Sequence, residues 1–410
     1  MSLPKCRACG SPLQHTFVDL GMSPLSNAYL RVEQLSQMEP FYPLHARVCD
    51  RCFLVQLEQF ETPQNIFGDY AYFSSYSESW LSHAREFAGR TVGQFGLNQE
   101  SLVVEIASND GYLLQYFRAQ GVPVLGIEPA QNVARAAEAK GVPTLVKFFG
   151  TVAARELTAA GRQADLIVAN NVLAHVPELN DFVAGLKLLL KPRGIITAEF
   201  PHLLRLVEGN QFDTIYHEHF SYFSFCTAAE IFARHGLDVF DVEQLPTHGG
   251  SLRVYAGHRE ASRPADGRVA KLRELEIAAG IRVLDFYSRF GERVRETKRA
   301  LLEVLIGAKR AAKSVAGYGA PAKGNTLLNY CGIGRDFLDY TVDISPHKQN
   351  HFLPGTHIPV YEPERIRQTR PDYILILPWN LRDEILAQLA DARQWGGRFV
   401  IPIPVAEVIE

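Results

Sequence analysis

The stretch LVVEIASNDGYLL, residues 102–114, decides the fold. A short, continuous apolar run, LVVEIA, ends in the polar loop SNDG, and a helical pattern begins at Tyr112. A run without alternating polar residues is typical of a strand buried on both faces, as in a parallel sheet covered by helices. The stretch therefore predicts the first strand, loop and helix of a doubly wound α/β domain.

The chain on both sides of this stretch has the same organisation. Further strands are expected at VPVLGIEP, TLVKFF, DLIVANN and GIITAEF, with helices over 130–140 and 178–191 between them. A helix near 227–235 and strands near 237–244 and 251–256 follow, and a long charged helical pattern fills roughly 266–312. A second α/β unit is expected from SVAGYGAPAKGNTLLNY, YTVDIS, DYILILP, a helix from Leu381, and RFVIPIP.

Composition excludes several classes of protein. The 410 residues are 47% hydrophobic and 21% charged, which is typical of a globular chain with two or three domains. A net charge of −3 gives no basic footprint, so we expect no nucleic-acid partner. No apolar stretch approaches the roughly 20 residues of a membrane span, and no secretory signal is recognisable. We expect a cytoplasmic protein with no membrane partner.

Two pairs of cysteines have metal-ligand spacing. Cys6 and Cys9 form one CxxC pair, and Cys49 and Cys52 form the other. In a reducing compartment, four thiolates predict a closed, tetrahedral, structural zinc site, whereas the alternative is four unrelated thiols. The remaining cysteines, Cys226 and Cys331, are interpreted as small buried hydrophobes.

The loops after the predicted strands indicate which ligand the first sheet binds. The loop from Glu105 to Gly111 lacks the G-x-G-x-x-G pattern that a dinucleotide needs, and its acidic start with Asn109 and Asp110 disfavours a phosphate and tolerates a cation. Glu128 ends the second strand, where a carboxylate can accept both hydroxyls of a ribose. Asn170 and Asn171 end the fourth strand.

These loops and the run NNVLAHVPEL resemble class I S-adenosylmethionine-dependent methyltransferases. The resemblance implies that residues 105–111, with Glu105, Ala107, Asn109 and Asp110, hold the methionine part of the cofactor. It implies that Glu128 holds the ribose and that Asn170 or Asn171 lies near the methyl donor. The chain departs from the class at Ala107 and Ser108, which replace glycines, and a sheet that binds another nucleotide is the alternative.

The stretch QFDTIYHEHFSYFS, residues 211–224, concentrates groups for proton transfer. Methyl transfer to carbon needs a base that removes a C–H proton, which suits histidine, and a donor to the resulting oxyanion, which suits Tyr216. If the stretch is extended, His217 and His219 share one face, and Tyr216 and Glu218 share the other. The alternatives are a metal site of His-x-His and a carboxylate, or a histidine bonded to the backbone.

Several motifs in order resemble the sugar C-methyltransferases of deoxysugar biosynthesis over nearly the whole chain. They are the two CxxC pairs, DYAYFSSYSESW, EIASNDGYLL, YHEHFSYFS and GYGAPAKGNTLLNYCGI with PHKQNHFLPGTHIPV and ILPWN. The resemblance implies a zinc-binding domain over 1–75, a class I methyltransferase Rossmann-like core over 76–260 and a second Rossmann-like domain over 261–410.

The resemblance also implies roles for single residues. His219 corresponds to the base, and Tyr216, Glu218, His175 and Tyr70 surround the sugar. Tyr72 or Tyr76 could exchange roles with Tyr70, and Tyr76 is a candidate for substrate binding. The alternative for His175 is a satisfied core histidine, and for the tyrosine cluster it is packing of the zinc domain.

The C-terminal unit contains a glycine loop, Gly317 to Thr326, between a predicted strand and helix. Outward-facing backbone N–H groups and Lys323 favour an anion, although a bare strand-to-helix turn is the alternative. By resemblance, this domain closes over a nucleotide-sugar, with Lys323 and Asn325 on the pyrophosphate and His347 or Lys348 nearby.

Together these features predict S-adenosylmethionine-dependent C-methylation of a nucleotide-linked 4-keto-6-deoxysugar, with dTDP as the expected nucleotide and C3 as the expected position. Alternatives are methylation at C5, methylation of a nucleic acid, or an NAD-dependent sugar-nucleotide binder. The expected cofactors are S-adenosylmethionine and structural zinc, and a monomer is plausible.

Overall fold

The computed structural model describes residues 3–67, 73–76 and 78–410. Contacts divide the chain into two compact units, each made of three separate stretches. The first unit contains Met1–Gln14, Cys49–Leu203 and Phe220–Arg282, and the second contains His15–Val48, Leu204–His219 and Val283–Glu410. Within the described ranges, no helix combines the length and the apolar character that crossing a membrane requires. The domain boundaries expected from sequence stay a prediction.

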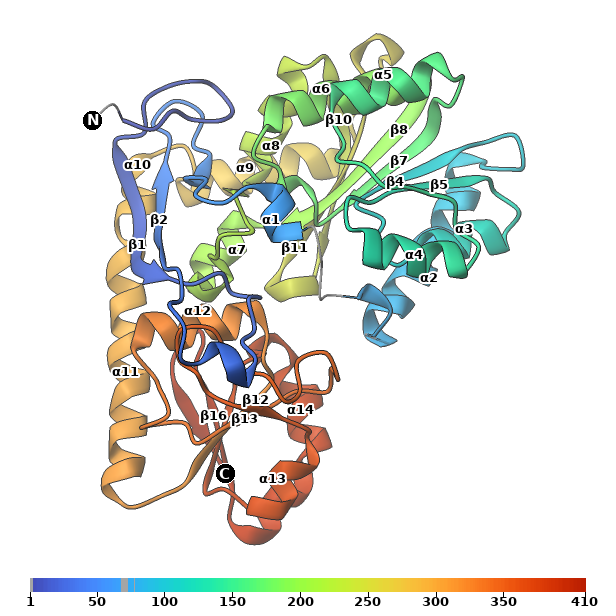
Figure 1. The fold of residues 1–410 in the computed structure, drawn as a ribbon. Coiled ribbons are helices and arrows are strands. Elements are labelled where there is room, and N and C mark those ends of the chain that lie inside the picture. The colour runs from blue at the N-terminus through green and yellow to red at the C-terminus, as the bar shows by residue number, and fades with distance from the viewer. Residues whose placement is uncertain (1–2, 68–72, 77) are drawn as a thin grey trace. The chain divides into compact units, whose positions relative to one another are not determined.

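The first unit is built around a seven-stranded sheet in the order β10-β11-β8-β7-β4-β5-β6 (Figure 1). Strands β4 to β8 run parallel, whereas β11 is antiparallel to β8 and β10 is antiparallel to β11. The doubly wound α/β core expected from sequence is confirmed. The strands are β4 (Val103–Ile106), β5 (Val124–Ile127), β6 (Thr144–Leu145), β7 (Ala164–Asn170), β8 (Leu190–Pro201), β10 (Leu237–Leu245) and β11 (Ser251–His258).

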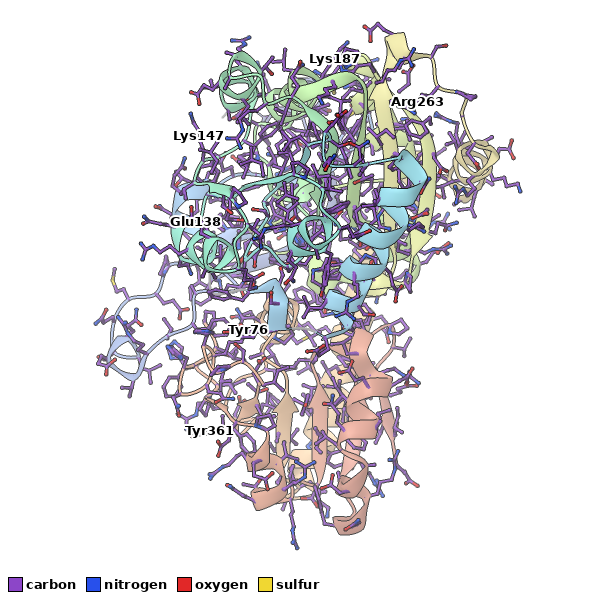
Figure 2. The ribbon with its side chains drawn as sticks, turned by 90° about the vertical axis from the view of Figure 1, so that its right-hand side faces the viewer. Tyr76, Glu138, Lys147, Lys187, Arg263 and Tyr361 are labelled. Atoms are coloured by element: carbon purple, nitrogen blue, oxygen red, sulfur yellow. The ribbon has the colours of Figure 1, made fainter. Side chains whose placement is uncertain are left out.

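Helices cover both faces of this sheet, because its strands are apolar on both sides. One buried cluster includes Phe182 and Phe232, and a second, separate cluster includes Phe87 and Phe117. Polar side chains such as Glu138 of α4 point away from the sheet (Figure 2). The helices are α2 (Glu78–Phe95), α3 (Leu114–Ala119), α4 (Gln131–Ala139), α5 (Thr151–Ala159), α6 (Leu179–Leu189), α8 (Phe225–Arg234) and α9 (Gly267–Ala279).

Short elements complete the first unit. Strand β3 (Val55–Leu57) pairs antiparallel with β9 (Ser221–Tyr222). The others are α1 (Pro63–Phe67) and the 3-10 turns η2 (Ser74–Tyr76), η3 (Leu173–His175), η5 (Thr247–Gly249) and η6 (Arg259–Ala261).

The second unit contains a six-stranded sheet in the order β14-β13-β12-β15-β16-β17, which confirms the second α/β unit. Its strands are β12 (Val315–Tyr318), β13 (Thr341–Val342), β14 (Val360–Tyr361), β15 (Tyr373–Ile376), β16 (Arg398–Ile401) and β17 (Glu407–Ile409). Its helices include α10 (Leu284–Ser288), α11 (Phe290–Arg310), α12 (Ala322–Cys331), α13 (Glu364–Thr369) and α14 (Arg382–Gln388), with the 3-10 turns η7 (Trp379–Leu381) and η8 (Ala390–Trp395).

Two N-terminal strands also belong to the second unit. They are β1 (His15–Ser23) and β2 (Tyr42–Val48), which pair antiparallel, and η1 (Val32–Gln34) lies between them. The second unit further holds η4 (Phe212–Thr214), and helix α7 (Leu203–Glu208) begins at the boundary of the two units.

Two expectations about secondary structure are wrong in detail. The helical pattern over 266–312 is not continuous, because α9 ends at Ala279 and is capped by Gly280, whose φ of 91° is the left-handed conformation of a helix C-cap. The strand expected at TLVKFF is reduced to Thr144–Leu145. Periodicity alone detects neither the end of α9 nor the shortness of β6. A single glycine causes the first, and a short pairing at the edge of the sheet causes the second.

Candidate active site

The four cysteines of the CxxC pairs form one cluster in the first unit. Their sulfur atoms lie within 4.8 Å of one another, with 3.5 Å between Cys6 and Cys52 and 3.5 Å between Cys9 and Cys49. Four thiolates at such separations fit a single tetrahedral zinc ion without an open position. The predicted zinc site is therefore confirmed as a group of four cysteines. Cys226 and Cys331 are buried as expected.

The loop after β4 keeps its shape without the usual glycines. Ala107 has φ 58° and Asn109 has φ 48°, both in the left-handed region that favours glycine, and Gly111 has φ 75°. Ser108 fits because a Cβ on Gly126 of the neighbouring strand would lie 2.3 Å from its hydroxyl oxygen. The missing glycine of the loop is thus compensated by a glycine one strand away.

Buried acceptor oxygens gather at the carboxyl ends of β4 and β7. Among the described residues, several of these atoms have no hydrogen-bond partner, and burial raises the pKa of Glu105 well above its ordinary value. A set of acceptors without donors fits a cationic, donor-rich ligand such as the ammonium and hydroxyl groups of S-adenosylmethionine. The atoms without a partner are Asp110 Oδ1, Asn170 Oδ1 and Asn171 Oδ1, whereas the hydroxyl of Tyr112 interacts with the carboxylate of Glu105.

Glu128 at the end of β5 supports the same loop. Its carboxylate accepts the backbone N–H of Asn109 at 2.9 Å and that of Ala130 at 2.9 Å. Asn109 Oδ1 in turn accepts the backbone N–H of Ser74 at 3.0 Å, and Asp110 forms an ion pair with Lys140 at 3.0 Å. The predicted cofactor residues are therefore hydrogen-bonded to one another and to the backbone at Ser74.

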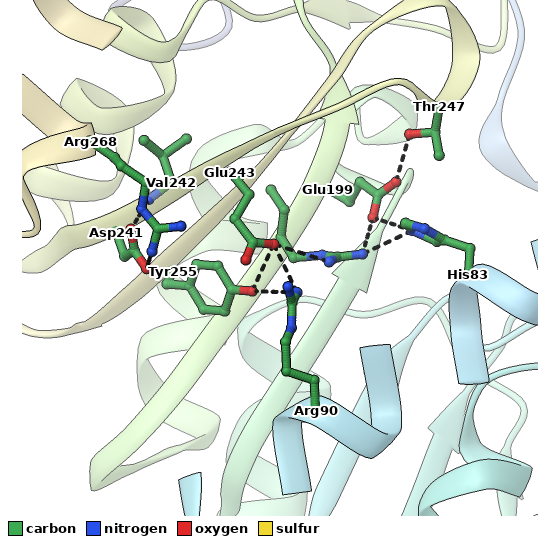
Figure 3. A network of polar contacts seen from close by, with 10 residues as sticks. His83, Arg90, Glu199, Asp241, Val242, Glu243, Thr247, Tyr255 and Arg268 are labelled. Carbon is green, nitrogen blue, oxygen red and sulfur yellow. Dashed lines mark hydrogen bonds and ion pairs between the residues drawn. The ribbon is translucent and has the colours of Figure 1, made fainter. Parts of the chain in front are cut away.

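A buried ionic network lies on the same sheet (Figure 3). Glu199 near the end of β8 accepts from Arg253 of β11 at 2.7 Å, from His83 of α2 at 3.1 Å and from Thr247 at 3.1 Å. Burial alone would raise the pKa of Glu199, but His83 and Arg253 hold it below its ordinary value. The network joins α2 to two strands of the sheet.

The motif at 216–219 is a turn, so the condition of an extended stretch, on which the alternating faces depended, is not met. The backbone N–H of His219 donates to the carbonyl of Tyr216 at 2.9 Å. This closure places the rings of Tyr216 and His219 side by side, with centroids 4.1 Å apart. The pair that sequence reasoning assigned to opposite faces therefore shares one.

The hydrogen bond of His219 determines its tautomer. Its Nδ1 lies 2.9 Å from the carbonyl oxygen of Thr214, and a carbonyl can only accept, so Nδ1 carries the proton. The neutral ring then has its lone pair on Nε2, which is the state that a general base requires. His219 and Tyr216 are both half-buried.

The other two members of the motif have different environments. His217 is buried, its Nε2 donates to the carbonyl of Pro43 at 3.2 Å, and burial lowers its pKa. It fits the alternative of a histidine bonded to the backbone. Glu218 is 4% exposed and accepts from the side-chain amide of Asn27 at 2.5 Å.

Of the remaining predicted catalytic residues, His175 belongs to the first unit. His175 ends η3 after β7, and its ring meets that of Phe67 edge-on at 5.5 Å. Tyr70 and Tyr72 lie outside the described residues. Tyr76 is 55% exposed and its ring lies 5.7 Å from that of Phe73. Their roles stay predictions.

The residues predicted to bind the pyrophosphate, in and near the glycine loop of the second unit, differ in burial and in hydrogen bonding. The ammonium of Lys323 donates to Asn380 Oδ1 and lies 4.4 Å from the ring centroid of Trp379, and burial lowers its pKa to about 8. Asn325 is 1% exposed, and its Nδ2 has no partner among the described residues, whereas His347 is exposed. Whether these three residues bind a pyrophosphate stays a prediction.

Sequence reasoning missed a buried carboxylate just before the motif. Asp213 in η4 accepts from Trp379 Nε1 at 2.7 Å, and burial raises its pKa to about 6 although Lys323 acts to lower it. Asn27 and the Glu199 network were missed as well. Charged residues inside apolar strands, GIITAEF and SLRVY, were the available signal for the network.

Three family profiles match consecutive parts of the chain. A zinc binding domain matches residues 6–67, a methyltransferase domain matches 80–242, and a C-methyltransferase C-terminal domain matches 246–404. A curated relative, the C-methyltransferase NovU of Streptomyces niveus, is 37% identical over 99% of this chain and 97% of its own length.

Other similarities are partial. The ubiquinone biosynthesis O-methyltransferase of a Methylobacterium species is 32% identical over 29% of this chain and 49% of its own length. The magnesium protoporphyrin IX methyltransferase of Synechocystis, solved with S-adenosylhomocysteine, has a TM-score of 0.36 at 15% identity, covering 43% of this chain and 83% of its own. A TM-score this low carries no further conclusion. The full-length relative and the profiles show that the chain belongs to the S-adenosylmethionine-dependent C-methyltransferases that combine an N-terminal zinc-binding domain, a methyltransferase domain and a C-terminal domain.

Proposed function

We propose that this C-methyltransferase acts on a nucleotide-linked 4-keto-6-deoxysugar, with dTDP as the nucleotide, and methylates C3 through an enolate. The single observation that supports this most is the bond from His219 Nδ1 to the Thr214 carbonyl, which leaves Nε2 as a proton acceptor beside Tyr216. A ketone at C4 acidifies the protons on C3. A neutral imidazole is therefore a base of adequate strength for the first step.

The proton moves from C3 to Nε2 of His219, and the imidazolium that forms keeps its Nδ1–H bond to Thr214. Negative charge develops on the oxygen at C4 as the proton leaves. The hydroxyl of Tyr216, beside His219, is the proposed donor to that oxygen, and a preorganised donor of this kind is worth about 3 kcal/mol. Glu218 is proposed to orient the sugar or the imidazole.

Bound S-adenosylmethionine would supply an electrophilic methyl group to C3, with cleavage of the sulfur–methyl bond and S-adenosylhomocysteine as the leaving group. Glu105 and Asp110 are proposed to accept from its ammonium group, Glu128 to bind the ribose, and Asn170 or Asn171 to lie near the sulfonium. Buried oxygens of Asp110, Asn170 and Asn171 have no partner among the described residues, which supports the assignment. His175 and a tyrosine at 70, 72 or 76 are proposed to contact the sugar, and Lys323, Asn325 and His347 the diphosphate.

An NAD-dependent activity is the weaker alternative. In the second unit, the acid that ends the second strand of a dinucleotide fold would have to bind a ribose. Here that acid, Asp343, accepts the backbone N–H groups of Ala320 at 2.8 Å and Ser345 at 2.8 Å, and it pairs with Lys348 at 3.4 Å. Glu128 also accepts two backbone N–H groups, so the pairing with Lys348 is the feature of Asp343 that disfavours a nicotinamide dinucleotide. The net charge of −3 likewise disfavours a nucleic-acid acceptor.

The test is incubation of the purified protein with S-adenosylmethionine and dTDP-4-keto-6-deoxyglucose in water and in deuterium oxide. Mass spectrometry reports the gain of one methyl group, and NMR of the product identifies the methylated carbon. We expect a 3-C-methyl product. Methylation at C5 would correct the position alone, whereas S-adenosylmethionine binding with no methylation and no deuterium uptake would exclude this class of acceptor.

A further inference from the structure

The carboxylate of Glu218 is held by a residue from a distant part of the chain. Asn27 lies in the connection between β1 and β2, and its Nδ2 donates to Glu218 Oε1 at 2.5 Å across 191 positions of sequence. Both residues belong to the second unit. Glu218 is 4% exposed and Asn27 is half-buried, so the bond is largely shielded from water.

The residues on both sides of Asn27 are hydrogen-bonded to the C-terminal glycine loop, to helix α12 and to Phe352. The hydroxyl of Ser26 lies 3.4 Å from that of Thr326 in α12, and the hydroxyl of Tyr29 donates to the carbonyl of Ala320 at 2.5 Å. Leu30 exchanges two backbone bonds with Phe352, at 2.9 and 2.8 Å. The side chain of Asn27 therefore extends from a segment that is anchored on both sides.

The same elements fix the segment that precedes the motif. Thr326 donates to the carbonyl of Ile215 at 3.3 Å, and the ring of Tyr330 in α12 meets that of Phe212 at 5.4 Å. The segments that carry Glu218 and Asn27 therefore both contact α12 and the loop before it. These contacts fix the positions of the donor and of the acceptor of the hydrogen bond.

We propose that Asn27 is a positioning residue for the proton-transfer step, because its side-chain amide fixes the orientation of the Glu218 carboxylate. The inference rests on the proposed function, since it concerns the role of Glu218 in that reaction. An amide donor to an ionised carboxylate forms a charge-assisted bond, which is shorter and stronger than a neutral one. A carboxylate freed from this bond could rotate, and small misplacements in an active site reduce kcat strongly.

The first test is Asn27→Ala in the full-length enzyme. We expect kcat for methyl transfer and the rate of deuterium uptake at the carbon alpha to the ketone to fall together by about tenfold or more. The affinity for S-adenosylmethionine should stay within about twofold. The control is Asn65→Ala, which removes an amide-to-carboxylate bond of the same type, to Glu61 at 2.7 Å, at an exposed site.

The second test is a double-mutant cycle that separates positioning from general support of the segment. Asn27→Asp places two carboxylates together in the wild-type background, but in the Glu218→Gln background the new Asp can accept from the Gln amide. Asn27→Asp should therefore lower kcat and Tm in the wild-type background much more than in the Glu218→Gln background. Equal Tm losses in both backgrounds would overturn the contact, even if Glu218→Gln has no measurable turnover.

The outcomes keep the two proposals apart. Wild-type protein that neither methylates nor deuterates the ketosugar would refute the proposed function, while the Tm cycle would still report on the Asn27–Glu218 pair. Wild-type activity with an unchanged kcat in Asn27→Ala would refute the positioning role alone. A kcat loss accompanied by an equal loss in cofactor affinity would also refute it, because that pattern indicates general disruption.

Discussion

Arg253 and Glu199 form an ion pair of 2.7 Å in which both side chains are almost completely buried. Such a pair contributes little net stability compared with apolar residues, but removing one partner leaves an uncompensated buried charge. The Arg253 guanidinium also lies 4.2 Å from the ring centroid of Phe87 in α2. The pair therefore fixes the helix that follows the segment at Ser74.

Glu199→Gln should destabilise the protein by about 3–5 kcal/mol, because Arg253 loses its counter-charge while it stays buried. Urea unfolding at pH 7 measures the change in the free energy of unfolding. The control is Glu243→Gln, which removes a more exposed partner of Arg253, 3.3 Å away, and should cost less. An equal loss in the two variants would contradict the dominant role of Glu199.

His219→Gln should reduce both methyl transfer and alpha-deuterium uptake by about 10²–10⁴-fold, because Gln cannot accept the C3 proton. His217→Gln is the matched control from the same turn, since His217 donates to the Pro43 carbonyl and Gln can donate there too. Mass spectrometry in deuterium oxide measures both reactions. Unimpaired deuterium uptake in His219→Gln would assign the base to another residue.

Glu105→Gln should weaken S-adenosylmethionine binding by about tenfold, since a cationic ligand stabilises a carboxylate whose pKa burial has raised, and the neutral Gln side chain lacks that charge. Isothermal titration measures the dissociation constant. Glu100→Gln is a suitable control because Glu100 is an exposed acid in the loop before β4. Unchanged cofactor affinity in Glu105→Gln would place the ammonium group elsewhere.

Cys49→Ser should abolish stoichiometric zinc binding and lower Tm, because three thiolates and a hydroxyl bind zinc far more weakly than four thiolates. Elemental analysis and thermal unfolding check this. Cys226→Ala, at a buried cysteine outside the cluster, should retain one zinc ion per chain. Retention of zinc by Cys49→Ser would contradict the four-sulfur site.

The raised pKa of Asp213 leads us to expect a specific dependence of the protein's stability on pH. Its pKa in the folded protein is about 6, above the ordinary value of 3.8, so the folded state binds more protons than the unfolded state between these values. The stability that it contributes is complete at low pH and is lost as the pH rises to about 6. The variant Asp213→Asn does not lose stability in this way, because its side-chain amide does not titrate.

The stability of Asp213→Asn relative to wild type should therefore increase by about 1 kcal/mol between pH 5 and pH 7. Urea unfolding across this range measures it, and the exposed acid variant Glu58→Gln provides the baseline. A difference between Asp213→Asn and wild type that is constant over the range would show that the Asp213 carboxyl titrates normally.

Elements defined by local pattern could be predicted from the sequence. The apolar run at 102–107 gives an interior strand of the sheet because burial on both faces requires it, and the two CxxC spacings identify four cysteines whose sulfur atoms do meet in space. The loop residues Glu105 and Glu128 lie at strand ends because the alternation of strands and helices places them there.

Elements defined by distant contacts could not be predicted. Asn27 acquires its place from a partner 191 residues away, and no local pattern encodes such a pairing. The turn at 216–219 follows from one backbone bond that competes with an extended stretch of similar propensity. Lys323 lies in a glycine-rich loop of the kind that binds anions. Its ammonium nevertheless donates to Asn380, whose position depends on tertiary folding.

The alternation of the two compact units along the chain has a consequence for how this enzyme can be divided. Each unit is assembled from three stretches, and the turn with His219 lies in a short stretch, Leu204–His219, that is flanked on both sides by chain of the other unit. No single proteolytic cut can therefore release an intact unit, and the second unit, which contains His219, is complete only after most of the polypeptide has been synthesised. Limited proteolysis should yield nicked protein that stays associated, and separately expressed halves should regain activity only when they are refolded together.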